Sequence, residues 1–289
     1  MSHRWKTCSW VTEGSMRTGI EWAQVSVMAA KEWRERIRNR WVLAVALIFA
    51  LFALAIAYFG TAQQGTVGFH GIDITVASLV SLVIYLVPLI AMILGYDAIV
   101  GERERGSLEL LLSMPITRFE ILLGKYLGLS AALACATAVG FGAGLLPLAA
   151  QLGLRDLYHY AGFVFSAILM GMAFLSLSLW LSVMAQDRMR ASGMAIATWF
   201  FFVLVFDLLL MGLLVVSKGN LGSTVFASLL MLNPADVFRL LNIFSSQQVQ
   251  TMYGLATVMP EGLTNPMVLL GIMLGWIIVP FLLANWRFK

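Results

Sequence analysis

The sequence predicts an all-α polytopic membrane protein with six transmembrane helices. Its 289 residues are 60% hydrophobic and have a mean hydropathy of +0.87, more apolar surface than a soluble domain of this length needs. The apolar residues fall in runs of about 20, enough to cross a bilayer core of roughly 30 Å. These runs must be helices because backbone groups in lipid need internal hydrogen bonds. They also lack the roughly ten-residue alternating segments of a membrane β-barrel.

The residues before the first span divide into two parts. We expect residues 1–24 to be a disordered tail, since no uninterrupted apolar region of a cleavable signal peptide follows its early basic residues. Residues 25–289 are expected to form one membrane domain. It begins with a helix on the membrane surface, whose basic side chains face anionic headgroups: Lys31, Arg34, Arg36, Arg38 and Arg40.

Six apolar runs give the predicted spans, which are 41–59, 76–100, 126–150, 161–184, 192–216 and 267–285. Gly124 and Gly128 stand four residues apart where the third span begins, a spacing that lets helices approach closely. Between the last two spans lies the sequence LNPADVFRLLN. Asn233 can cap a helix there and Pro234 can open it. We expect this short helix to lie in the membrane interface or to re-enter it.

Lysine and arginine are distributed unevenly between the two sides of this topology. The N-terminal region, segment 97–128, residues 185–191 and the C-terminus together hold 16 of them. The opposite loops hold three: Arg155, Lys218 and Arg239. The positive-inside rule therefore places both termini and segment 97–128 in the cytoplasm, and residues 217–266 outside.

Segment 97–128, DAIVGERERGSLELLLSMPITRFEILLGKYLG, is a charged interruption between two apolar runs. We expect Ser107 to cap a short amphipathic helix and Pro115 to follow its end. The apolar face of that helix consists of Leu108, Leu111 and Leu112. Thr117 and Glu120 have the spacing of a capping box for the next helix. The alternative interpretation is an ordinary solvated loop.

The sequence lacks the motifs of several catalytic and metal-binding classes. A phosphate-binding loop is absent, because Phe119 and Tyr126 stand where the motif around Lys125 requires Gly and Ser or Thr. Three histidines without an HExxH motif, and Cys8 and Cys135 without a CxxC motif, indicate neither a metal centre nor a disulfide framework. The 16 methionines are interpreted as core-filling residues. We therefore predict no catalytic or metal-binding residue, no cofactor bound by this chain and no nucleic-acid partner.

Asp207 is the one charge deep inside a predicted span, and no neighbour on its own helical face can pair with it. A carboxylate at the centre of a bilayer costs about 2.5–3.5 kcal/mol on insertion scales, so a partner must come from elsewhere. One interpretation is a site on a transport or coupling path. The other is an aspartate in the outer leaflet that is hydrogen-bonded to re-entrant backbone near Arg239.

Several stretches carry a family resemblance. The segment YDAIVGERERGSLELLLSMPITRFEILLGKYLG resembles the connection between the second and third spans of ABC-2 type transporter permeases. RNRWVLA, WFFFVLVFDLLL and LNPADVFRLLN narrow the likeness, over about residues 25–289, to permeases that serve copper-site maturation of nitrous oxide reductase. The resemblance implies a non-catalytic homodimer in the bacterial inner membrane. It also implies a cytoplasmic NosF-like ABC ATPase, which would bind ATP and Mg, and a periplasmic NosD-like subunit.

The resemblance also implies roles for particular residues. The ATPase-coupling residues would be Glu102, Arg103, Glu104, Arg105, Ser107, Leu108, Leu111 and Leu112. Asp97 and Asp207 would be intramembrane charges, and the periplasmic partner would contact Asn233, Pro234, Asp236 and Arg239. The nearest alternative is an ABC-2 exporter of another cargo, such as a drug, a lipid or a polysaccharide precursor. An ion-driven carrier is disfavoured because matching broken helices are not visible, and an intramembrane enzyme because paired catalytic groups are absent.

Overall fold

The computed structural model describes residues 21–38, 40–59, 72–146, 153–218, 222–245 and 265–288, and within these ranges it contains helices and no strands. Most of the predicted disordered tail, the loop after the first span and part of segment 217–266 lie outside the described residues. Five helical segments are long and apolar enough to cross a membrane: 78–104, 118–145, 157–184, 188–216 and 266–287. Two bent helix pairs raise this number to seven if each is counted as one span.

The bent pairs account for the remaining apolar segments. The first consists of α1 (Trp22–Arg38) and α2 (Trp41–Phe59), and α2 has the bounds predicted for the first span. The second consists of α10 (Ser223–Leu230) and α11 (Pro234–Ser245), which meet at an angle of 114°. The described chain therefore has five to seven apolar crossing segments, a range that includes the six predicted from sequence.

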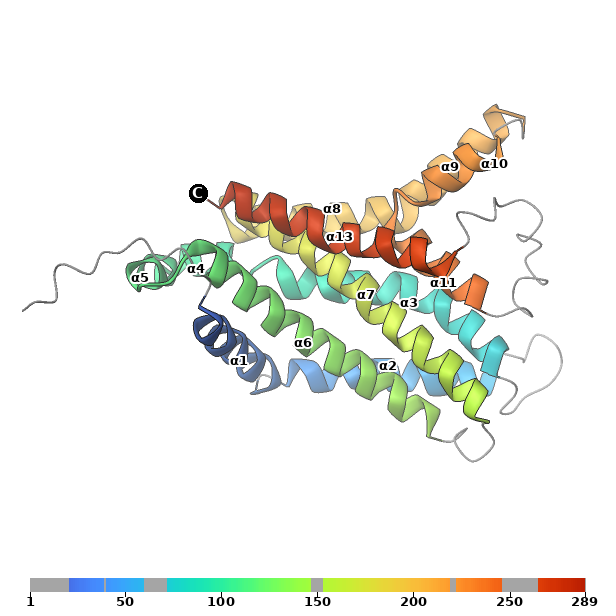
Figure 1. Ribbon diagram of the computed structural model, residues 1–289, viewed down its shortest axis with the longest axis horizontal. Coiled ribbons are helices and arrows are strands. Elements are labelled where there is room, and N and C mark those ends of the chain that lie inside the picture. The colour runs from blue at the N-terminus through green and yellow to red at the C-terminus, as the bar shows by residue number, and fades with distance from the viewer. Residues whose placement is uncertain are drawn as a thin grey trace, which may run out of the picture.

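The central helices pack side by side in one bundle (Figure 1). They are α3 (Ile72–Gly95), α6 (Arg118–Leu145), α7 (Leu154–Met184) and α13 (Pro266–Arg287). The middle of α7 carries buried serines, and each hydroxyl is used to join α7 to a neighbour. Ser178 donates to the Met92 carbonyl of α3 at 2.8 Å, and Ser176 donates to the Ile277 carbonyl of α13 at 2.7 Å. Buried hydroxyls bonded in this way cost little in an apolar core, because their polar atoms are not left unpaired.

A ridge of small residues on α6 lets two helices, α1 and α2, pack closely against it. The residues at every fourth position are Gly124, Gly128, Ala132, Ala136, Gly140 and Gly144. A Cβ atom at Gly128 would lie 2.6 Å from the Ala29 carbonyl oxygen of α1, and one at Gly144 would lie 2.4 Å from the Ala53 Cβ of α2. The close approach predicted from Gly124 and Gly128 is therefore present, and the helix that approaches there is α1.

The third predicted span begins inside a longer helix, whose start at the Thr117 capping box the sequence also predicts. Prediction placed its start at residue 126, whereas α6 begins at Arg118. Thr117 and Glu120 form a complete capping box, in which the Thr117 hydroxyl accepts from Glu120 N and the Glu120 carboxylate accepts from Thr117 N. This cap starts the helix before the apolar run begins, so Lys125 belongs to a packed helix and not to a loop.

Candidate functional site

The charged segment between α3 and α6 folds into two short helices, α4 (Val100–Glu104) and α5 (Ser107–Ser113). Gly106 separates them with φ of 71°, a left-handed conformation that glycine adopts without steric cost. Ser107 was expected to cap α5, but Gly106 occupies the cap position and the Ser107 hydroxyl donates to the Glu102 carbonyl at 3.3 Å. α5 ends at Ser113, before Pro115, as the sequence predicts.

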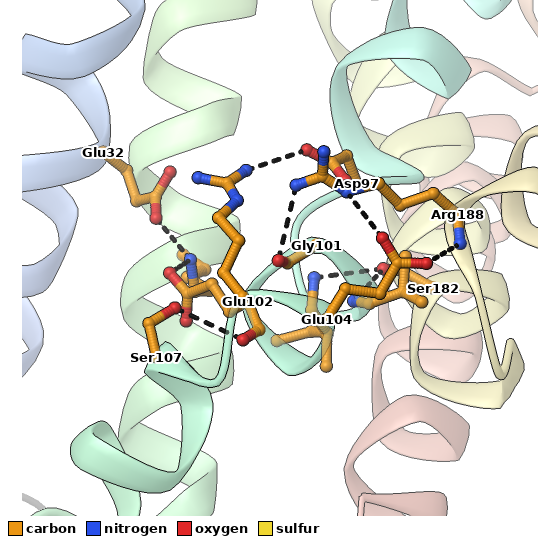
Figure 2. A network of polar contacts seen from close by, with 12 residues as sticks. Glu32, Asp97, Gly101, Glu102, Glu104, Ser107, Ser182 and Arg188 are labelled. Atoms are coloured by element: carbon orange, nitrogen blue, oxygen red, sulfur yellow. Dashed lines mark hydrogen bonds and ion pairs between the residues drawn. The ribbon is translucent and has the colours of Figure 1, made fainter.

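The first contact region of this segment is the Lys125 cluster, which consists of Glu32, Glu102 and Lys125 (Figure 2). Lys125 of α6 has a side chain that is 2% exposed. Its Nζ pairs with Glu32 of α1 and, at 2.6 Å, with Oε1 of Glu102 in α4. The Glu32 and Glu102 side chains are 5% and 13% exposed. One buried ammonium therefore joins three helices that are far apart in sequence.

The second contact region is the Arg188 cluster, which consists of Asp97, Glu104 and Arg188 (Figure 2). Arg188 is the first residue of α8 (Arg188–Phe200). Its Nε lies 2.8 Å from Asp97 Oδ1 and 3.3 Å from Glu104 Oε2, and its backbone N–H donates to Glu104 Oε1 at 2.8 Å. Gly101 packs directly beneath, because an added Cβ would lie 2.2 Å from Asp97 Oδ1. This cluster fixes α4 to the start of α8.

The C-terminal end of α7 gives α4 a third attachment. Ser182 Oγ accepts hydrogen bonds from the backbone N–H groups of Ile99 and Val100, at 3.0 and 3.1 Å. These N–H groups stand at the start of α4, where backbone donors lack a partner within the helix. The Arg103 guanidinium donates to the Ala185 carbonyl at 2.7 Å. α4 is thus held on three sides, by α6 with α1, by α7 and by α8.

In contrast to α4, α5 and the residue after it carry exposed apolar side chains, beside the exposed Glu109 and Ser113. Leu110, Leu112 and Met114 are 68%, 36% and 51% exposed, while Leu108 is 7% exposed and packs inward. Beside these side chains lies an apolar groove of about 440 Å³. It is lined by Ala23, Gln24, Val27, Met28, Lys31, Leu111, Met114 and Ile116, so α1 forms one wall and α5 with its following loop forms the other. We call Leu110, Leu112 and Met114 with this groove the α5 face.

A second polar cluster lies at the opposite end of the molecule, where α11 meets α9 (Phe206–Val216). Asp207 Oδ2 accepts from Arg239 Nη2 at 3.0 Å, and Arg239 Nη1 pairs with Asp236 Oδ1 at 2.6 Å. Asn233 caps α11 by accepting the Ala235 N–H at 3.0 Å, and its amide donates to Asp236 Oδ2 at 2.8 Å. Asp207 therefore lies near Arg239, as one of the two sequence interpretations has it, but its partner is the Arg239 side chain and not the re-entrant backbone which that interpretation named.

Comparison with known proteins shows which family this chain belongs to. The family model described as ABC-2 family transporter protein matches residues 26–289. The chain belongs to this ABC-2 transporter family. It is 47% identical over 223 residues to a probable ABC transporter permease protein NosY of Pseudomonas aeruginosa, an alignment that covers 76% of this chain and 81% of that protein. It is 42% identical over 271 residues to a protein of the same description from Stutzerimonas stutzeri, which covers 92% of this chain and 98% of that protein.

Membership of the family confirms several expectations. Permeases of this family are multi-pass membrane subunits without catalytic activity, and a separate ABC ATPase partner hydrolyses the ATP. The resemblance to the NosY permeases found in the sequence is likewise confirmed. In the described part of the permease, no group of three or more His, Cys, Asp or Glu side chains could hold a metal ion.

The residues predicted to couple the permease to its ATPase separate into two groups. Glu102 and Leu108 point into the protein, and Arg103, Glu104 and Arg105 are bonded to α7, Arg188 and Asp97. Leu111 lines the groove and Leu112 is exposed beside it. Charged residues thus hold the segment in place, while apolar ones remain available to a partner. Asp97, predicted as an intramembrane charge, lies in the turn between α3 and α4 with Arg105 and Arg188 as partners.

Sequence reasoning missed Glu32, Lys125 and Arg188 as site residues. Glu32 is surrounded in sequence by charged residues that are exposed, so its charge alone suggested an exposed position. Its spacing from Val25 and Met28 nevertheless places it on the buried face of α1. The capping box at Thr117 could have indicated that Lys125 lies inside a helix and faces a neighbour. Arg188 offered no such signal, because its partners come from a segment more than 80 residues away.

Proposed function

We propose that this permease docks a cytoplasmic ABC ATPase on the α5 face and works as the membrane subunit of a NosY-type system. The observation that carries the proposal is a set of exposed apolar side chains on a segment that is otherwise fixed by ion pairs and hydrogen bonds. Exposed leucine and methionine side chains in a polar setting are typical of a protein interface. Because α4 is held rigidly, a displacement of α5 by the ATPase would be transmitted directly to the helices around α4.

The finer assignments follow from the likeness to NosY permeases. We propose a homodimer in the bacterial inner membrane, with six spans, both termini in the cytoplasm and α11 toward the periplasm. A NosF-like ATPase would occupy the cytoplasmic side, and a NosD-like subunit would contact the outer end around Asn233, Pro234, Asp236 and Arg239. The assembly would serve copper-site maturation of nitrous oxide reductase. Surface lysine and arginine on α1 would contact anionic lipid.

A charge placed on the α5 face tests the docking site. We expect Leu110→Glu with Met114→Glu to abolish co-purification of the ATPase in mild detergent, because both side chains are exposed and their replacement would place charge in an apolar interface. Met189→Glu is the matched control, since Met189 is 84% exposed on α8 outside this face. Normal ATPase recovery with the double variant would refute docking at α5.

The cargo alternative needs a different measurement. Deleting the permease gene in a denitrifying host should leave nitrous oxide reductase protein present but deficient in copper, and the wild-type chain should restore its copper content. The Leu110→Glu, Met114→Glu variant should not restore it. Full copper content in the deletion strain would instead favour an ABC-2 exporter of another cargo.

A further inference from the structure

The span that begins at Arg188 is interrupted near its middle. α8 is followed by a π-helical turn, η4 (Phe201–Val205), and then by α9. The Phe206 N–H bonds the Phe201 carbonyl across this wider turn. Such single π-helical turns inside α-helices loosen the regular hydrogen-bond ladder and are frequent at functional sites. The turn gives this span a place where its two halves can change their relative direction.

The helix α11 holds the span at and just beyond this turn. The Asn233 side-chain amide donates to the Phe202 carbonyl within η4 at 2.8 Å. The Arg239 guanidinium reaches Asp207, the second residue of α9, at 3.0 Å. Asn233 and Asp236 are each 1% exposed, and α11 packs against α3, α7 and α13. These contacts tie the start of α9 to a part of the bundle that is itself fixed.

Past this attachment, α9 has little support. Leu208, Met211, Val215 and Val216 are 68%, 66%, 73% and 81% exposed. Figure 1 shows α9 and α10 leaving the bundle together, whereas α8 packs against α3 and α7. The hydrogen bonds of η4 and Asp207 with α11 therefore attach the start of α9 to the bundle.

The same span begins in the Arg188 cluster at the cytoplasmic end. Arg188 binds Asp97, Glu104 and the Gly101 carbonyl of the coupling segment. A displacement of α4 must therefore move the start of α8, and η4 lies between that point and the Asp207–Arg239 pair. We propose that η4 is a hinge and that the Asp207–Arg239 ion pair is a latch that fixes the direction of α9. The latch would open when α4, in segment 97–128, moves and displaces the start of α8. This inference rests on the proposed ATPase docking.

Distance measurements between spin labels test the hinge. Labels at Val216→Cys on α9 and Met267→Cys at the start of α13, both exposed, report the position of α9 against the bundle. Cys8 and Cys135 are first replaced by alanine, and labelled subunits are diluted with unlabelled ones. In the complex with its ATPase, trapping with ATP and vanadate should produce a second distance population. Asp207→Asn should produce that population without nucleotide, because the latch loses its charge.

The outcomes separate this inference from the docking proposal. Failure of the wild-type permease to recover an ATPase would overturn the docking proposal and the hinge with it. ATPase recovery and ATP hydrolysis with one unchanged distance in all states would overturn the hinge alone. Met211→Leu, an exposed change one turn along α9, is the control and should behave as wild type. Without nucleotide, Asp207→Glu should show the single distance of the wild type again. If Asp207→Asn had changed the distance only by unfolding the protein, the conservative Glu variant would not be expected to restore it.

Discussion

Lys125 shows how a charged residue can be part of a core. Its ammonium is enclosed by α6, α1 and α4, with Glu32 and Glu102 as partners. Replacing a whole buried ion pair with apolar groups can be neutral, but removing one partner leaves a buried charge uncompensated. Two carboxylates depend on one lysine here, so loss of the lysine is the most damaging single deletion in the cluster.

We expect Lys125→Met to lower the free energy of unfolding by about 3–5 kcal/mol, the usual cost of breaking a buried pair. The measurement is the thermal midpoint of the purified permease in detergent. Lys31→Met is the control, because the Lys31–Glu35 pair is 3.9 Å long and about half exposed, and such pairs are worth about 0–1 kcal/mol. Equal midpoints for the two variants would contradict the structural role of Lys125. The triple variant with Glu32→Gln and Glu102→Gln should recover part of the loss.

Gly101 gives a second residue-scale prediction. Gly101→Ala would place a Cβ 2.2 Å from Asp97 Oδ1 and 2.8 Å from Arg188 Nη2, so the Arg188 cluster must open. We expect a folded permease that still binds the ATPase but loses the coupling of ATP hydrolysis to copper delivery. Gly193→Ala on α8 meets no atom within 4 Å and should be neutral or stabilising, since alanine favours a helix over glycine by roughly 0.5–1 kcal/mol. If Gly193→Ala also uncoupled ATP hydrolysis from copper delivery, the effect of Gly101→Ala could not be assigned to the Arg188 cluster.

At the scale of helices, local sequence signals determined what could be predicted. The apolar run 41–59 has the bounds of α2, and the run 267–285 lies within α13, whereas α7 begins at Leu154, before the predicted 161. Asn233 with Pro234 predicted the start of α11. The capping box at Thr117 and Glu120 predicted the start of α6, which lies before the apolar run begins. Nothing in WFFFVLVFDLLL signals the π-turn at Phe201–Val205, whose Phe202 carbonyl accepts a hydrogen bond from Asn233 of α11. Helix ends set by neighbours cannot be obtained from local periodicity.

The ridge on α6 carries the element-scale prediction. Gly128→Leu should displace α1, because even a Cβ would lie 2.6 Å from the Ala29 carbonyl and the Glu32 Cβ. We expect a lower thermal midpoint and faster proteolysis within α1, followed by mass spectrometry of the fragments. Gly142→Leu lies on the same helix with no atom within 4 Å of the added Cβ and should leave α1 protected. Unchanged proteolysis in Gly128→Leu would mean that α1 does not depend on this contact.

For the whole molecule, the positive-inside count predicts the orientation, and the structure shows that several of the counted basic residues lie at one end. The basic residues Arg103, Arg105 and Arg188 gather at the end where α4 and α5 lie, and the α10–α11 bend lies at the other end (Figure 1). Sequence predicted which segments share a side because charge bias acts during insertion. It could not show that the charges on one side also bind one another, because those pairs join residues far apart in the chain.

This orientation predicts which of two exposed serines a membrane-impermeant maleimide can reach. Ser113 ends α5 and Ser223 begins α10, and both are exposed. In a background without Cys8 and Cys135, Ser223→Cys should react in spheroplasts, whereas Ser113→Cys should react after lysis. The reason is that the bilayer separates α5 from the outer end. The reverse pattern would invert the topology, and reaction of both in sealed spheroplasts would place α5 outside, where no ATPase could reach it.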